Sequence, residues 1–382
     1  MDEADLLSRC RDLAPVLAAH AREGERLRRV PEPVVAAVAE ADLLRAVVPT
    51  ALGGHGLGVG ALCRGVAELG RGCPASAWTM SFLMLHAWML SRFPAEAHDE
   101  LFGDGRVPTA SAPLAPTGTL AAAPGGYRVT GRWEWATAIH HSDWCIVHGF
   151  DETVEFGTRF AVVPITEVAV EDTWHTAGMR ATGSCTVSVD GVFVPEARTA
   201  PGELLREMTG GVEGDGLAGL PLLGLLALLA SAPAVGAAQA ALDLYRDRLA
   251  ERVLAYTLGD RAADQPLAQA RLAAVASEVA TMAAGWTAAI DELATAAGGA
   301  PDDLLRVRTR LAAAAAVRTS RRVIGAIGEG AGASVYALDH PIQRLQRDVE
   351  TLKGHVVFDW DRTTELAGRV MLGQPLGPLD MA

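Results

Sequence analysis

The stretch GRWEWATAIHHSDWCIV, residues 131–147, places three tryptophans and two adjacent histidines within a pattern that is typical of β-strands. Around it, runs such as YRVTGRWEW, TRFAVVPI and TVSVDGVFVP are rich in Val and Thr, alternate apolar and polar residues, and are separated by Gly, Pro and Asp. Asp190 and Gly191 are a strong signal for a tight turn between strands. We therefore predict a small β unit that spans residues 106–206.

Helical patterns flank this unit on both sides. Before it, apolar residues recur at three- and four-residue spacing, and PASAWTMSFLMLHAWMLSRF is apolar on nearly every side, which predicts a buried helix. After it the chain is Ala-rich, and we predict four long helices over 229–256, 265–298, 301–328 and 341–372. The expected fold is α+β, with an N-terminal helical domain (1–105), a central β domain (106–206) and a C-terminal four-helix bundle (207–382).

Composition narrows the class of partner. The chain has 382 residues and a formal net charge of -13, so the phosphates of nucleic acids and anionic membranes would be repelled and small molecules are favoured. Its five cysteines form an odd number without a CxxC pair, which indicates neither a disulfide framework nor a zinc site, and no other metal site is expected. The acidic start MDEADLLSRC lacks the pattern of a signal peptide, so we expect a cytoplasmic protein.

One uncharged segment, residues 216–242, is long enough to span a bilayer. Pro221 and Pro233 interrupt it, small residues crowd its second half, and no Lys/Arg cluster flanks it. We predict a buried helix of the bundle rather than a membrane span.

Four motifs along almost the whole chain, taken together and in this order, resemble the acyl-CoA dehydrogenase superfamily: VPTALGGHG, GRWEWATAI, GMRATGSCTVSVDGVFVPE and PIQRLQRD. The resemblance implies the acyl-CoA dehydrogenase fold, with a flavin ring between the β domain and the bundle. It also implies an assembly of four copies, as a dimer of dimers.

The resemblance assigns flavin contacts to two segments. In the first, Trp135 would flank the ring, and Thr137 would place its hydroxyl at the N5 edge with Ala138 beside it, whereas Trp133 and Trp144 would fill the core. In the second, Thr182, Gly183 and Ser184 would lie near the flavin or its phosphates, or would form a polar turn before a strand. Residues 138 and 139 depart from the family pattern.

The catalytic base of a dehydrogenase is missing. Its usual glutamate lies nine residues after the Arg of the RD motif, and that position here is Val356. The alternative position falls within the uncharged segment 216–242, and the T-E-P-x-x-G-S-D segment is also absent.

Two histidines suggest another branch of the superfamily. If residues 341–372 are helical, His355 lies on one face with Asp348, Thr351 and Asp359, where it either pairs with Asp359 or exchanges protons near a flavin. GCPASAWTMSFLMLH likewise resembles a segment whose final histidine, here His86, points at the substrate. Both features are similar to the flavin-dependent monooxygenases of this fold, which are two-component enzymes.

The branch implies a chemistry and a set of partners. A separate flavin reductase would supply reduced FMN or FAD, which would react with O2 through a C4a-hydroperoxyflavin to hydroxylate a small aromatic substrate, or an amine as in nitrososynthases. His355 and His86 would be catalytic, and Trp78, Ser111 and His140 would contact the substrate, although His141 is an alternative to His140. The other readings are an acyl-CoA dehydrogenase with a relocated base and a non-catalytic scaffold.

Two arginines of the RD motif allow two interpretations. Arg344 and Arg347 would either hold a flavin phosphate or pair with Asp348 and neighbouring helices.

Overall fold

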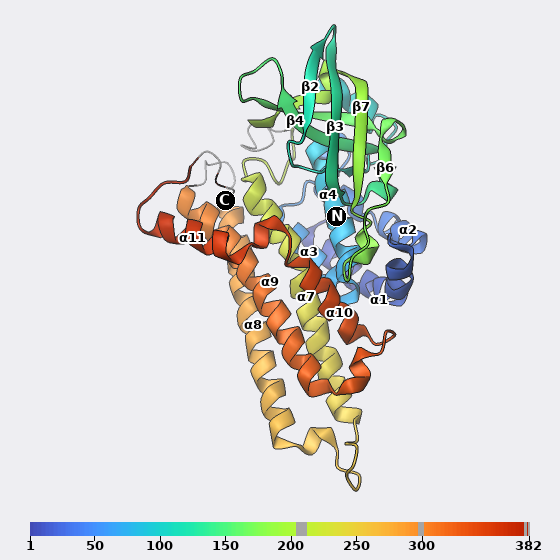
Figure 1. Ribbon diagram of the computed structural model, residues 1–382, viewed down its shortest axis with the longest axis vertical. Coiled ribbons are helices and arrows are strands. Elements are labelled where there is room, and N and C mark those ends of the chain that lie inside the picture. The colour runs from blue at the N-terminus through green and yellow to red at the C-terminus, as the bar shows by residue number, and fades with distance from the viewer. Residues whose placement is uncertain (204–211, 297–301, 378–379, 381–382) are drawn as a thin grey trace.

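The computed structural model describes residues 1–203, 212–296, 302–377 and 380, and it shows the α+β fold that the sequence predicts. In Figure 1 the sheet lies at one end of the molecule, the long helices of the bundle extend from it, and the N-terminal helices lie beside the junction. The predicted boundary between residues 206 and 207 lies outside the described residues.

The N-terminal helices are α1 (Glu3–Leu27), α2 (Glu32–Glu40), α3 (Val59–Gly72), α4 (Pro74–Leu90) and α5 (His98–Phe102). A capping box formed by Asp2 and Asp5 begins α1, and Arg28 ends it in the left-handed conformation. Every residue of α4 is buried, so the prediction from its apolar sequence is confirmed. As a result, α4 lies between the sheet and the bundle.

The central sheet consists of strands β1 (Ala110–Ser111), β2 (Gly118–Ala123), β3 (Gly126–Ala136), β4 (Trp144–Asp151), β5 (Thr158–Pro164), β6 (Ala169–Glu171), β7 (Cys185–Pro195) and β8 (Thr199–Pro201). Their order is β6-β7-β3-β2-β4-β5-β8, and β1 pairs with β4. One core, which includes Trp133 and Val147, lies within the β domain, whereas Ile146 and Phe160 pack into the main helical core. The sheet is therefore covered by α4 and its neighbours on one face.

The predicted turn at Asp190 and Gly191 is wrong, because both residues lie inside β7. The pairing with β3 shifts there, and Gly191 adopts φ +63° while its N–H donates to Thr130 at 3.0 Å. Two residues of β7 thus face one residue of β3, and the Gly signal marks a β-bulge.

The bundle contains α7 (Leu222–Glu251), α8 (Pro266–Thr295), α9 (Asp303–Ala331), α10 (Pro341–Leu352) and α11 (Trp360–Met371). Helix α7 starts seven residues before the predicted start at 229 and ends five residues before the predicted end at 256. Helix α9 continues beyond its predicted end at 328 to Ala331. The predicted limits 298 and 301 lie outside the described residues. The single helix predicted over 341–372 is wrong, because residues 353–359 separate α10 from α11.

Helices α7 and α8 are long and apolar enough to cross a membrane by length and composition alone. In α7, 89% of the apolar window is buried inside the protein, as expected for the central helix of a bundle. In α8 only 33% of the window is buried, so much of its small apolar surface faces outward.

Candidate active site

Helix α4 carries a row of three rings. Trp78, Phe82 and His86 follow one another at four-residue spacing, which places them on one face of the helix. Ring centroids lie 4.9 Å apart for the first pair and 5.4 Å apart for the second. At one end of the row, the Trp78 ring meets the edge of His355 at 5.4 Å. The structure therefore brings both predicted catalytic histidines to one aromatic row.

His86 is held as a neutral imidazole. Its Nδ1 lies 2.8 Å from the carbonyl oxygen of Ala110 in β1, and because a carbonyl only accepts, Nδ1 must donate. The neutral ring then has a bare Nε2 that can accept a hydrogen bond. Burial lowers the pKa of His86 to about 4, so this form predominates at neutral pH.

His355 is held in the opposite way. The prediction that it lies on a long helix is wrong. It precedes the short 3-10 helix Val356–Phe358 in the connection between α10 and α11. The Val357 N–H donates to its Nδ1 over a long 3.4 Å, so the neutral ring carries its proton on Nε2. Burial, and then the charge of Arg310, lower the pKa of His355 to about 4.

Arg310 of α9 holds this connection in place. Its guanidinium donates to the carbonyl oxygens of Val357 at 3.2 Å and Val356 at 3.0 Å, and the side chain is buried. Hydrogen bonds from a charged group are stronger than neutral ones, so Arg310 fixes the backbone that carries His355.

A cluster of hydroxyl groups adjoins the row. The Thr137 hydroxyl lies 2.8 Å from that of Ser184, which lies 2.8 Å from that of Thr182. The indole N–H of Trp78 donates to the Thr137 oxygen at 3.3 Å. The predicted flavin residues Thr137, Thr182 and Ser184 are thus together, and Trp78 connects them to His355.

The backbone around this cluster is irregular. Trp135, Ala138, Met179 and Gly183 all have φ between +52° and +67°. A register shift between Trp133 and Ala136 turns one tryptophan into the core and the next outward: Trp133 is 0% exposed and Trp135 is 65% exposed. An exposed tryptophan beside buried hydroxyls is the kind of surface that a planar aromatic cofactor covers.

The turn before β7 is fixed against α10. Asp348 accepts the Met179 N–H at 2.6 Å, and a Cβ at Gly178 would lie 2.0 Å from the Arg347 carbonyl oxygen, so only glycine allows this approach. Burial raises the pKa of Asp348 to about 6. Arg347 forms an ion pair with Glu25 and donates to the Ala177 carbonyl at 2.8 Å. This arginine therefore has the structural role that was one of its two interpretations.

The predicted substrate residues differ in their surroundings. Ser111 follows the residue that binds His86; its hydroxyl is buried and lacks a hydrogen-bond partner among the described residues. His140 lies against the turn before β7, with Nε2 3.6 Å from the Cys185 sulfur. His141 is buried near Glu32 of α2. In the part of the chain that the structure describes, no ring contact joins either histidine to α4.

Two segments of the chain match family models of the acyl-CoA dehydrogenases. Residues 2–102 match the N-terminal domain, and residues 228–360 match the C-terminal domain. Over 392 aligned residues the chain is 31% identical to the oxygenase component of FADH(2)-dependent resorcinol hydroxylase from Rhizobium sp., covering 97% of this chain and 95% of that protein. It is 29% identical to the oxygenase subunit HsaA of a flavin-dependent monooxygenase from Mycobacterium tuberculosis, with 98% and 97% covered.

The chain belongs to the flavin-dependent monooxygenase oxygenases of the acyl-CoA dehydrogenase fold. Solved structures agree: XiaF from Streptomyces sp., in complex with FADH2 and glycerol, is similar with a TM-score of 0.91 and 31% identity over 99% of this chain and 96% of that one. The predicted family, fold and enzyme class are thereby confirmed, and so is the use of reduced flavin and O2.

The residues of this oxygenase fit a flavin. The cluster of Thr137, Thr182 and Ser184 offers hydroxyl groups, and Trp135 offers an exposed aromatic ring beside them. Within the described residues, no group of three or more His, Cys, Asp or Glu side chains is arranged to hold a metal ion.

Two residues that support the site of this oxygenase, Arg310 and Ala110, have no signal in the sequence. Arg310 lies in an Ala-rich helix, 46 residues from the nearer of the two carbonyls that it binds, so no local pattern reveals it. The Ala110 carbonyl belongs to the backbone, which no side-chain motif can show.

Proposed function

We propose that this oxygenase hydroxylates a small aromatic substrate with reduced FAD and O2, and that a separate flavin reductase supplies the flavin. One observation carries the proposal: two neutral histidines, which are opposite tautomers, lie at the same aromatic row. Trp78 connects this row to the hydroxyl cluster. FAD is favoured over FMN because the names of the resorcinol hydroxylase and of the XiaF complex both include reduced FAD.

The chain would bind the flavin through two kinds of contact. Thr137, Thr182 and Ser184 would hydrogen-bond its polar edge, with Ala138 and Gly183 allowing close approach of the backbone, and Trp135 would cover its ring. When bound, reduced flavin would supply the two electrons that activate O2, from which the oxygen atom is transferred. The residues around it would bind and orient the substrate and exclude water.

The histidines would divide the proton chemistry between them. His86 presents an acceptor at Nε2, which suits the hydroxyl proton of a phenol, whereas His355 presents an N–H donor at Nε2. Neither Nε2 has a hydrogen-bond partner within the described ranges, so both are available to a substrate.

The remaining contacts favour a flat, apolar substrate. Trp78 and Phe82 would provide ring contacts, and the Ser111 hydroxyl, which lacks a partner among the described residues, would bind a polar substituent. His140 would lie beside the hydroxyl cluster rather than in the aromatic row. Hydroxylation of an aromatic ring is preferred to N-hydroxylation because two of the relatives are named as hydroxylases of resorcinol and of p-hydroxyphenylacetate.

We further propose a cytoplasmic homotetramer arranged as a dimer of dimers. Most exposed residues of α8 are small, mainly alanines, and Tyr256 and Leu258 are fully exposed in the connection between α7 and α8. Both features are expected where helices of neighbouring copies pack closely. All five cysteines are free and buried, which fits a reducing compartment.

The test supplies photoreduced FAD anaerobically, adds O2, and measures hydroxylated product and hydrogen peroxide with resorcinol, 4-hydroxyphenylacetate and indole-3-acetate as trial substrates. We expect product to exceed peroxide with at least one of them, and Thr137→Val to weaken binding of reduced FAD by about tenfold, as expected for one lost hydrogen bond.

Two other outcomes would contradict the proposal. Oxidised FAD that copurifies and is bleached by an acyl-CoA would indicate a dehydrogenase with a relocated base. Failure to bind flavin in either redox state would indicate a scaffold without catalytic activity.

A further inference from the structure

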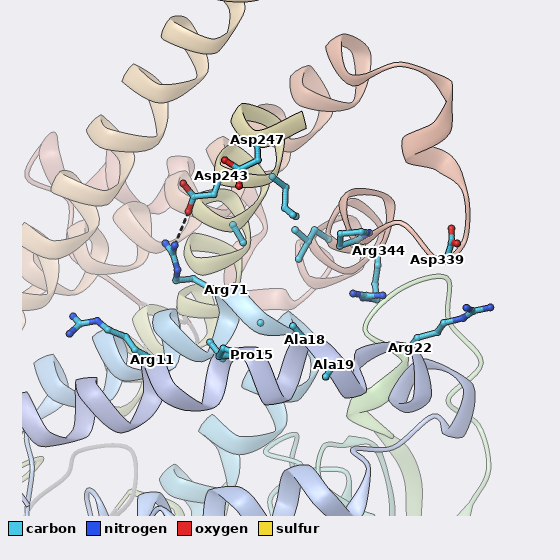
Figure 2. A pocket seen from close by; sticks show the side chains of 16 residues that line it. Arg11, Pro15, Ala18, Ala19, Arg22, Arg71, Asp243, Asp247, Asp339 and Arg344 are labelled. Carbon is cyan, nitrogen blue, oxygen red and sulfur yellow. Dashed lines mark hydrogen bonds and ion pairs between the residues drawn. The ribbon is translucent and has the colours of Figure 1, made fainter. Parts of the chain in front are cut away.

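A cavity lies between α1, α7 and α10 (Figure 2). Its volume is about 760 Å³, and no residue of the hydroxyl cluster or of the aromatic row lines it. Its apolar walls are formed by Ala14, Pro15, Ala18, Ala19, Leu244 and Leu345. This volume and lining suit a small organic molecule rather than a bare ion.

Arg344 is the residue of this cavity that lacks a hydrogen-bond partner for a buried N–H among the described residues. Its side chain is 7% exposed, and its Nε is fully buried without a hydrogen-bond partner. No hydrogen bond or ion pair of Arg344 is found in the described part of the chain. In Figure 2 the side chain extends from α10 toward α1. The Arg344 charge interacts with the buried carboxylate of Asp348, where it partly offsets the effect of burial on the pKa of that group. No hydrogen bond of the Nε is found among the described residues, and a buried N–H without a partner is unfavourable.

The other charges around the cavity are largely paired. Arg71 binds Asp243 at 2.7 Å, as the dashed line in Figure 2 shows, and Arg11 binds Glu68 at 3.0 Å. Asp247 is likewise paired at 3.0 Å, with an arginine one residue before it.

Three charged groups are left over at one end of the cavity. Arg22 and Asp339 join Arg344 there, and no ion pair is found for any of the three within the described residues. Among the side chains that line this end of the cavity, two are positive and one is negative.

We propose that this cavity binds a small organic anion. A phosphate or carboxylate group of the ligand would be held by Arg344 and Arg22, because the planar guanidinium fork matches both groups. A hydroxyl or amine elsewhere on the ligand would donate to Asp339. The site is separate from the flavin and substrate contacts, and the inference does not depend on the proposed reaction.

The test measures binding of inorganic phosphate, pyrophosphate and succinate to the flavin-free protein by isothermal titration calorimetry, at ionic strength held constant with NaCl. We expect saturable one-to-one binding of at least one probe, and the comparison of pyrophosphate with succinate distinguishes phosphate from carboxylate ligands. Arg344→Gln should weaken it by about tenfold or more, as expected for a lost charged hydrogen bond. Arg11→Gln is the matched control: it lines the same cavity but already has a partner, so affinity should change less than twofold.

Several results would overturn the proposal. Absence of saturable binding for all three probes would do so, as would equal weakening by both variants, which would indicate general surface charge. A parallel loss of reduced-FAD affinity in Arg344→Gln would assign the arginine to the flavin site. If no probe bound and Arg344→Gln had a different molar mass from the unchanged protein in light scattering, a second copy of the chain would fill the cavity. Arg344→Lys, which keeps the charge without the fork, replaces the glutamine variant if that protein does not fold.

Discussion

His86 and His355 have the same lowered pKa but are held by different kinds of structure. His86 sits in the fully buried helix α4 and donates to a strand carbonyl, whereas His355 sits in an irregular connection and accepts from the backbone of the next residue but one. The first arrangement is fixed by packing on all sides, and the second depends on one arginine. The comparison shows that backbone partners alone can make one histidine an acceptor at Nε2 and another a donor at Nε2.

The largest effect is expected from the donor. His355→Ala should lower the rate of substrate hydroxylation by about a hundredfold, the lower range for loss of a proton-transferring group. The measurement is the ratio of hydroxylated product to hydrogen peroxide after adding O2 to the reduced complex. His355→Gln keeps an N–H donor and should recover part of the loss. Equal loss in both variants would show that the donor role is wrong.

The lowered pKa of His86 should make the free energy of unfolding depend on pH. The pKa of His86 is about 4 in the folded protein and near 6.5 when unfolded, so its neutral form stabilises the fold fully above pH 6.5. As pH falls from 6.5 to 4, about 3 kcal/mol of that stability is lost. His86→Gln cannot be protonated, and urea unfolding at pH 7, 6, 5 and 4 should show a weaker pH dependence.

The same series on His355→Gln serves as the comparison. His355 has the same lowered pKa as His86, so its removal should flatten the pH dependence by a similar amount. An unchanged pH dependence in His355→Gln would contradict the lowered pKa of His355.

The connection that carries His355 can be loosened through its arginine. Arg310→Met removes the bonds to the carbonyls of Val356 and Val357 and should lower the free energy of unfolding by about 2 kcal/mol. Because the Arg310 charge lowers the pKa of His355, its loss should raise that pKa and move the pH profile of hydroxylation upward. Arg308→Met, on the same helix but half-exposed, is the control and should change neither.

The smallest effect is expected within the aromatic row. Phe82→Leu removes ring contacts to Trp78 and His86 and should cost about 1 kcal/mol in urea unfolding. Phe93→Leu, at a similarly buried position, should cost a similar amount. Only the first change should also increase peroxide release, because only Phe82 touches both rings. A change in peroxide release from Phe93→Leu would contradict a specific role for the row.

Sequence patterns predicted the parts of the fold that depend on local order. Residues 74–90 are apolar on nearly every side, which predicted a buried helix, and alternating apolar and polar residues predicted the strands. Both signals are contained within one element. The break after α10 was missed although Gly354 lies in it, since the apolar spacing of α10 and α11 continues across it. Asp359, whose side chain accepts the Arg362 N–H, is a helix-start signal that would have revealed the break.

The site was predictable only in part for a related reason. Trp78, Thr137 and His355 lie in motifs, and resemblance to a family brings such residues together. Their protonation and orientation depend on partners remote in sequence: the Ala110 carbonyl for His86, and Arg310 for the connection. The outward direction of Trp135 depends on a bulge that follows from strand pairing and not from a local pattern.

The burial of α7 also has a consequence for how the protein is made. Its cover consists of α3 and α4, which leave the ribosome earlier, and of α8 and α9, which leave it later. During synthesis one side of this long apolar helix therefore meets water until α9 has been translated. Such exposed apolar surface promotes aggregation of the nascent chain, so binding of chaperones is needed most while residues 252–331 are being synthesised.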